Sequence, residues 1–262
     1  MKNILLTYFV FFHISFAFAQ TEAEKFKNEE LNNKELSRNE LKDQLIKHDF
    51  SSLFTHTDNS VVYGFIGDNY QRIRVKIIKI TKDDLSPDIY HIYGKSMVKN
   101  KLNEFTGSIK ISNIRKLKSI SYGLDDEYKN KGIKGEFIIV GEYRFSENEK
   151  QNHSGVFKGI CKSDFYLDEN SKIRYDDIEF NSDGYTNNQF VGQWTEYKTN
   201  LTKRCNWGDF RIPNSGNFDI GAGEFSPDDK FLKYGWQTVR DLGVSNQNNE
   251  KAKQIEEAKW WK

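Results

Sequence analysis

The most constraining feature of the sequence is an alternation of apolar and polar residues that recurs in segment after segment. Clear examples lie at residues 72–77, 105–111, 137–145 and 157–165. A period of two is typical of antiparallel strands with one buried face. Turn-forming Asp, Asn and Gly residues separate the segments, and no gap between them leaves room for a crossover helix. The chain is therefore predicted to be mainly β, an antiparallel meander of roughly eight strands between residues 60 and 211.

This meander is predicted to close into a barrel, with a two-sheet sandwich as the alternative. Strands with interior glycines bend where a barrel wall curves. Phe-x-Gly recurs at residues 105–107, 157–159 and 190–192. In a strand the ring and the glycine share one face, so neighbouring rings can pack over the glycine or a ligand can enter. The alternation slips after Ile77, where Ile78 and Ile80 continue the apolar side, and this predicts a β-bulge.

One of these segments resembles a motif of a known barrel family. Gly192-Gln193-Trp194 is similar to the Gly-x-Trp of lipocalin-type barrels. In that family the motif lies on the first strand, whereas here it lies on one of the last. The resemblance covers three residues and is out of place, so it implies no ligand and no residue role.

The first 19 residues have the pattern of a secretory signal peptide. Lys2 precedes an apolar run at residues 4–18, which closes on Ala17-Phe18-Ala19. The run is short for a membrane span, a charged stretch follows it, and no cysteine at the cut offers a site for a lipid anchor. We therefore predict an exported, soluble protein, periplasmic or extracellular, with no lipid anchor and no transmembrane segment after signal removal.

Net charge and amino-acid composition restrict the kinds of source organism and binding partner that the sequence predicts. Lys2 is the one formally charged residue that cleavage removes, so acidic and basic side chains then balance at 38 each. A neutral chain lacks the net basic face on which nucleic-acid binding depends, and no nucleic-acid partner is predicted. Lys, Asn and Ile outnumber Ala, which is typical of an AT-rich bacterial genome. The remaining partners are an unknown small ligand or a protein of the bacterial envelope.

The rest of the chain is predicted to have three parts. Residues 20–52 form a charged helical leader, and residues 53–247 form a single β domain. Within that domain the alternation stops after Arg204, so residues 205–247 are predicted to be an irregular Gly/Asn-rich cap with aromatic anchors. Packed segments of this length are often functional or cover an open end. Residues 248–262 form a polar helical tail that ends in Trp260-Trp261.

Two cysteines, Cys161 and Cys205, are the only ones in the chain. In an oxidising compartment two such thiols commonly pair, so a disulfide is predicted, with two buried thiols as the alternative. Neither cysteine has a CxxC partner or a nearby histidine, which disfavours a metal site.

Two groups of carboxylates are candidates for chemistry. Asp177 and Glu179 share a strand face, and with Asp183 they offer oxygen ligands of the kind that Ca²⁺ takes, although the spacing is not that of an EF-hand. Asp219 and Glu224 lie in the irregular segment among aromatic residues, as a glycosidase pair would. Motifs for nucleotide binding and for serine hydrolases are missing from the sequence, and no cofactor is predicted.

Aromatic residues supply most of the apolar bulk, with 20 Phe, 13 Tyr and 5 Trp. Tyr143, Trp194 and Trp207 are the candidate ligand-binding side chains. The leading hypothesis is a non-enzymatic binding protein that holds a small apolar or sugar-like ligand in an aromatic interior. A secreted hydrolase that uses Asp219 and Glu224 is one alternative, and an envelope interaction protein without a small ligand is another.

Overall fold

The computed structural model describes residues 20–243 and 247–262, so the predicted signal peptide at 1–19 lies outside the described residues. The strands are β1 (Leu36–Glu40), β2 (Val62–Ile66), β3 (Gln71–Lys82), β4 (Ile89–Val98), β5 (Lys101–Leu117), β6 (Gly135–Glu147), β7 (Gly155–Leu167), β8 (Ile173–Tyr175), β9 (Asn187–Glu196) and β10 (Thr202–Asp209). The helices are α1 (Glu22–Leu31), α2 (Lys42–Leu45), α3 (Gln237–Leu242) and α4 (Gln247–Glu257). Short 3₁₀ turns are η1 (Leu53–Thr55), η2 (Asn59–Val61), η3 (Gly216–Phe218) and η4 (Asp229–Tyr234).

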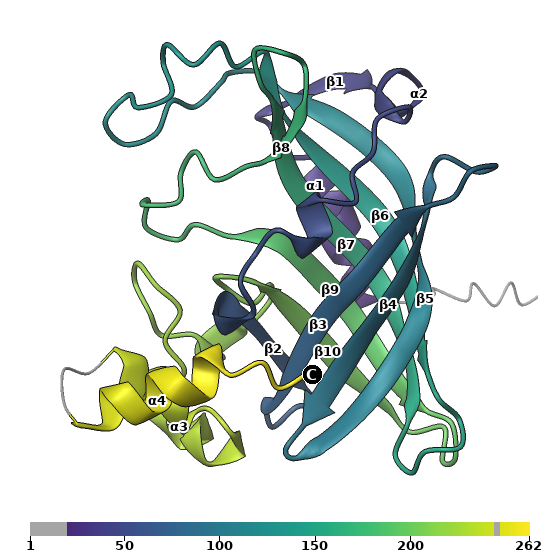
Figure 1. Ribbon diagram of the computed structural model, residues 1–262, viewed down its shortest axis with the longest axis vertical. Coiled ribbons are helices and arrows are strands. Elements are labelled where there is room, and N and C mark those ends of the chain that lie inside the picture. The colour runs from purple at the N-terminus through teal and green to yellow at the C-terminus, as the bar shows by residue number, and fades with distance from the viewer. Residues whose placement is uncertain (1–19, 244–246) are drawn as a thin grey trace, which may run out of the picture.

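Eight of the strands form a closed ring (Figure 1). Each strand from β2 to β7 pairs with the next along the chain, β7 pairs with β9, β9 with β10, and β10 with β2. All of these pairings are antiparallel. The short strands β1 and β8 pair with the ends of β5 and β7 outside the ring. The predicted antiparallel meander is confirmed, and its ring of eight strands has the pairing of a barrel rather than of two open sheets.

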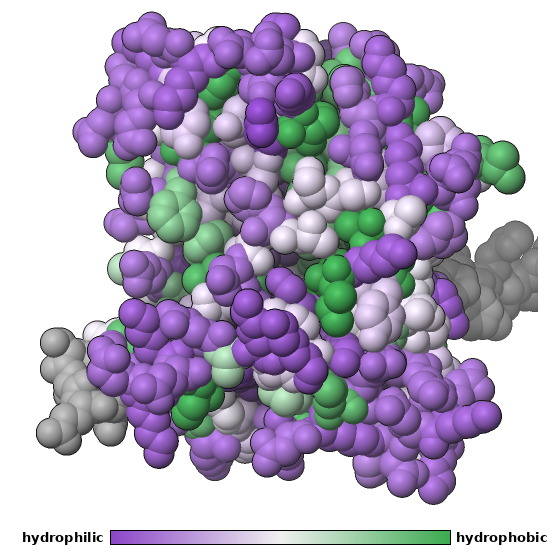
Figure 2. Space-filling view, in the orientation of Figure 1, coloured by the Kyte–Doolittle hydropathy of each residue, from purple (hydrophilic) through white to green (hydrophobic). Residues whose placement is uncertain are grey.

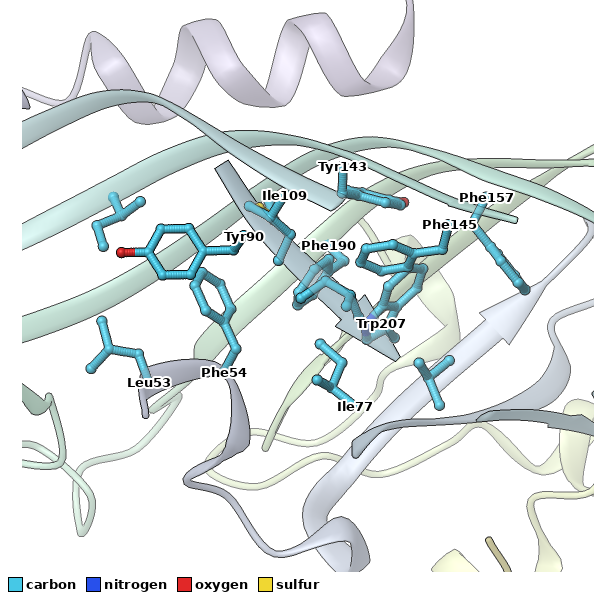
Figure 3. Packing of buried hydrophobic residues seen from close by; sticks show 14 of the residues in the cluster. Leu53, Phe54, Ile77, Tyr90, Ile109, Tyr143, Phe145, Phe157, Phe190 and Trp207 are labelled. Atoms are coloured by element: carbon cyan, nitrogen blue, oxygen red, sulfur yellow. The ribbon is translucent and has the colours of Figure 1, made fainter. Parts of the chain in front are cut away.

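Aromatic side chains fill the middle of the ring. Figure 3 shows Tyr143, Phe145, Phe190 and Trp207 directed toward one another from different strands. The rings of Phe190 and Trp207 stack with their centres 4.7 Å apart, and Tyr143 meets Trp207 edge-on at 5.2 Å. Such pairs add to the stabilisation that burial of the rings already provides. The centre of the barrel is therefore a packed core.

The segment before β2 closes one end of the barrel. Phe50, Leu53 and Phe54 are buried and belong to the same core as the strand interiors. The Asn188 side-chain amide donates to the Leu53 carbonyl at 2.9 Å, and the Phe50 N–H donates to the Tyr90 hydroxyl at 3.1 Å. Tyr90 and Asn188 lie near the same end of their strands, so the segment plugs that end and leaves the other open.

The leader is not a single helix. Helix α1 begins after Thr21, whose side-chain oxygen accepts from the Glu24 N–H, and it lies on the outer face of the barrel with Phe26 buried. Strand β1 then follows, because Leu36 is buried where it pairs with Leu117 at the end of β5. Sequence periodicity missed β1, since its pattern is buried at one residue only.

The C-terminal segment covers a side of the barrel and not its open end (Figure 1). Its boundary also differs from the prediction, because residues 205–209 belong to β10. Phe65 points outward from β2 and packs with Phe218, Trp236 and Val239. Helix α4, predicted from the sequence, is held by Glu256, whose carboxylate pairs with two arginines of β3.

The β-bulge is confirmed, since the register between β3 and β4 shifts between Ile77 and Lys79. Ile78 is 38% exposed and does not continue the apolar side, whereas Ile80 packs against the core. Within residues 20–243 and 247–262, no helix has the length and apolar content needed to cross a membrane. On the face drawn in Figure 2, hydrophilic residues predominate and hydrophobic residues are scattered among them.

The predicted disulfide between Cys161 and Cys205 is wrong, because both cysteines are free and fully buried. Cys161 on β7 pairs across with Phe190 of β9, and Cys205 on β10 pairs with Gly192 of the same strand. One strand thus separates the two cysteines, which puts their Cα atoms about 9.5 Å or more apart. A disulfide needs Cα atoms within about 7 Å.

Candidate functional site

A large cavity opens at the end of the barrel that the plug leaves free. Its volume is about 1980 Å³, and its lining includes residues of the barrel interior as well as outer residues such as Glu22 and Lys158. We call its inner part the mouth. The inward-facing residues of the mouth are Ile66, Ile73, Ser96, Val98, Lys101, Asn103, Tyr143, Glu147, Phe157 and Trp194. They combine an apolar wall with a few polar groups, as small-molecule sites do.

Glu147, the last residue of β6, is a buried carboxylate at the centre of the mouth. Its Oε1 accepts from the Ser96 hydroxyl at 2.6 Å and from the Asn103 side-chain amide at 3.2 Å. Its Oε2 accepts from the Gly155 N–H at 2.8 Å and from the Trp194 indole at 3.0 Å. Four donors from four strands therefore hold this carboxylate and fix the orientation of the Trp194 ring.

Three polar atoms of the mouth lack a hydrogen-bond partner within the described part of the chain. They are the Tyr143 hydroxyl, the Asn103 Oδ1 and the Lys101 Nζ, each buried. Burial raises the pKa of Tyr143 well above its ordinary value, so the hydroxyl keeps its proton and can donate. An unpartnered buried group costs about 1–3 kcal/mol, and such groups call for an explanation in a native structure. The three together offer two donors and one acceptor.

Two glycines make room for the end of Tyr143. Gly159 of β7 and Gly192 of β9 are cross-strand partners. A Cβ on Gly192 would lie 2.6 Å from the Tyr143 hydroxyl oxygen, and one on Gly159 would lie 2.9 Å from it. The Phe-x-Gly segments at 157–159 and 190–192 thus admit a packed aromatic side chain, which answers the question that the sequence left open.

The structure separates the predicted ligand-binding aromatics. Tyr143 and Trp194 line the mouth, and the Lys203 Nζ lies 6.0 Å from the centre of the Trp194 ring. Trp207 is not part of the lining, because it is stacked on Phe190 in the packed centre of the barrel. Two of the three candidates therefore belong to one site.

The two candidate catalytic carboxylates have different surroundings. Asp219 Oδ2 pairs with the Arg211 Nε at 2.9 Å, and its Oδ1 accepts from the N–H groups of Gly221 and Ser226 at 3.0 Å each. Asp219 therefore holds its loop in shape. Glu224 is exposed at the surface of the same loop. Neither residue lines the mouth.

The calcium candidates Glu179 and Asp177 make local hydrogen bonds. Both oxygens of Glu179 accept from the hydroxyls of Ser121 and Ser182, and Asp177 accepts from the Tyr128 hydroxyl at 3.4 Å. Asp183 lies beside Gly223. Throughout residues 20–243 and 247–262, no group of three or more His, Cys, Asp or Glu side chains could hold a metal ion.

Sequence reasoning missed Lys101, Asn103 and Glu147. A signal was present, because Asn103 is in phase with Phe105 and Glu147 with Phe145, which puts a polar residue on the buried face of each strand. Polar residues at buried positions at a strand end are the pattern to look for.

Fold and site together define an eight-stranded antiparallel barrel, plugged at one end, with a polar-centred aromatic cavity at the other. Comparison of the chain with protein-family models, with curated proteins and with solved structures finds no match.

Proposed function

We propose that this protein is a non-enzymatic binding protein that holds a small ligand in the mouth of its barrel. The observation that carries the proposal is that three residues lining one cavity, Lys101, Asn103 and Tyr143, each carry a buried polar atom without a hydrogen-bond partner. A ligand that supplies their missing hydrogen bonds removes the cost of leaving them unpaired. The Trp194 ring, fixed by Glu147, provides a flat apolar surface beside them.

The class of ligand follows from the hydrogen-bond donors and acceptors that these three groups need as partners. Lys101 and Tyr143 donate, while the Asn103 oxygen accepts. A hydroxyl group both donates and accepts, and the apolar face of a sugar ring packs on an indole. A sugar-like molecule with several hydroxyls satisfies the mouth better than a purely apolar ligand, which would leave all three groups unpaired.

The binding function is proposed for an exported protein, processed after Ala19. The cut is compatible with the fold, because Glu22, the third residue after it, is held by Arg204 at 2.8 Å and by Asn206 at 3.0 Å. The processed chain thus keeps every residue of this anchor. Mass spectrometry of the protein from its own periplasm or medium tests the cut, and an intact residue 1 would contradict it.

Native mass spectrometry of the same material tests the binding function. We expect a bound mass that is lost on denaturation, followed by identification of the ligand on a glycan array. A clean apo mass together with no glycan that raises the melting temperature would refute the proposal.

A Tyr143→Phe variant tests the role of the mouth. Removing the unpartnered hydroxyl should leave the stability of the free protein equal or higher by about 1 kcal/mol, while affinity falls by roughly 5- to 20-fold. Tyr93→Phe is the matched control, because the Tyr93 hydroxyl bonds to Glu104 on the outer wall. Equal affinity in the Tyr143 variant and the control would place the ligand elsewhere.

A further inference from the structure

A second pocket, of about 450 Å³, lies at the plugged end of the barrel, away from the mouth. It is bounded by the residues from the end of η1 to η2, by the segment between β5 and β6, by the end of β8 and by the segments that follow β8 and β10. Its walls are mainly aromatic. We call it the aromatic pocket, and its ring-bearing residues are His56, Tyr128, Tyr175, Phe180, Tyr185 and Phe210.

The rings of the aromatic pocket are held in fixed mutual positions. Phe210 meets Phe180 edge-on at 5.3 Å and lies 5.0 Å from Tyr185, while His56 stacks on Tyr175 at 4.4 Å. Two of the tyrosines, Tyr175 and Tyr185, are also held by hydrogen bonds from their hydroxyl groups. Tyr175 donates to the buried Asp209 carboxylate at 2.9 Å, and Tyr185 donates to a backbone carbonyl at 2.5 Å. The pocket is therefore preorganised.

Phe180 lines this pocket and is also exposed at the surface. Its side chain is 53% exposed, which is unusual for a phenylalanine whose ring contacts two other rings. A ligand that enters the pocket would cover this ring.

The charged side chains that line the aromatic pocket are all acidic, and the lysines near them, Lys76, Lys131 and Lys259, are not part of its lining. Asp58, Glu127 and Asp177 line it, and among the described residues that do so there is no lysine or arginine. Hydrogen bonds from Ser60 lower the pKa of Asp58 and keep it ionised at neutral pH. These carboxylates repel an anion and attract a cation.

The chain itself supplies one example of such attraction. The Lys131 Nζ lies 4.0 Å from the centre of the Tyr128 ring, well within the range of a cation–π contact. Aromatic faces combined with carboxylates are the arrangement that recognises ammonium groups without N–H donors, since such groups need no hydrogen-bond acceptor.

We propose that the aromatic pocket formed by Tyr175, Phe180, Tyr185 and Phe210 binds a small organic cation of the quaternary-ammonium class. This site is separate from the mouth, and it stands or falls independently of the binding function proposed above. The exposed ring of Phe180, with Tyr185 and Phe210 beside it, provides apolar contact for the methyl groups, and the three carboxylates provide the charge.

Calorimetric titration of the mature chain with choline tests this site, with 3,3-dimethylbutan-1-ol as the neutral probe of the same shape. We expect choline to bind about tenfold more tightly than the alcohol, the ratio that a partly desolvated cation–π site provides. Asp177→Asn should weaken choline binding and leave binding of the alcohol unchanged.

Phe180→Ala should lower choline affinity by roughly five- to tenfold, and circular dichroism should confirm that the variant is folded, since this side chain is already half exposed. Leu85→Ala is the matched control, because Leu85 is 95% exposed and lies outside the pocket. Equal affinity for choline and the alcohol would overturn the cation specificity. Lack of choline binding up to millimolar concentration, or an unchanged affinity in Phe180→Ala, would overturn the site.

Discussion

Truncating Glu147 should remove the hydrogen-bond acceptor on which the mouth depends. A Glu147→Ala change leaves four donors without their partner, from Ser96, Asn103, Gly155 and Trp194. Each donor left unpaired costs about 1 kcal/mol, the low end for buried groups. We therefore expect a loss of about 4 kcal/mol.

Urea unfolding followed by circular dichroism measures this loss as a lower midpoint at an unchanged slope. Glu149→Ala is the matched control, since Glu149 is an exposed residue of the adjoining loop and should change stability by no more than about 0.5 kcal/mol. Glu147→Gln keeps the shape and one acceptor oxygen, so it should lose about half as much as the alanine variant. It also keeps the test open if the alanine variant does not fold.

A loss below about 1 kcal/mol in Glu147→Ala, with the slope unchanged, would refute the reasoning. It would mean that the four donors find other partners, and that the carboxylate does not organise the mouth.

Three further predictions concern titration, thiols and wall packing. Burial, together with the carboxylates of neighbouring strands, raises the pKa of Asp176 to about 8, so the folded state holds a proton that the unfolded state has lost, and stability should fall as pH rises from 5 through 8. Urea midpoints measured across this range should fall less steeply in Asp176→Asn than in the wild type. An equal pH dependence in the two proteins would contradict this prediction. Because Cys161 and Cys205 are unpaired and fully buried, alkylation followed by mass spectrometry should label neither cysteine in the native protein and both after denaturation. A protein mass lower by two hydrogens, which indicates a disulfide, or labelling of the native protein would be inconsistent with the fold. Gly192→Ala should abolish soluble expression, since the new Cβ would lie 2.3 Å from a backbone oxygen, whereas Gly243→Ala, whose nearest neighbour is 3.6 Å away, should be tolerated in the same assay.

The sequence was sufficient to predict most of the long strands of the ring because their residues obey a local rule, whereas β1 and the end of β10 were missed. In β6, for example, Phe137, Tyr143 and Phe145 are buried on the interior side, as their spacing predicts. The bulge at Ile77 was likewise visible as a slip of the same period. Features that follow from periodicity along one strand could therefore be predicted from the sequence.

Features that depend on which strands become neighbours could not be predicted from the sequence. Cys161 and Cys205 looked like a disulfide until β9 was seen to lie between their strands. The plug residue Phe50 sits in a segment with no regular pattern, so nothing local marks it as buried. Asp219 and Trp207 were chosen for their residue type, and their neighbours turned out to be an ion pair and a packed core.

The pairing of β2 with β10 has a consequence for how the chain acquires its structure. The ring closes where Ile66 meets Cys205, two residues far apart in the sequence, and Glu22 of α1 binds Arg204 on the same late strand. Contacts of such long range form slowly, because a long loop must be ordered before they do. Until residues 202–209 have been synthesised, neither the ring nor the α1 anchor can be complete. A chain that stays open for most of its synthesis can still pass through a narrow channel, which is the state that the export proposed above would require.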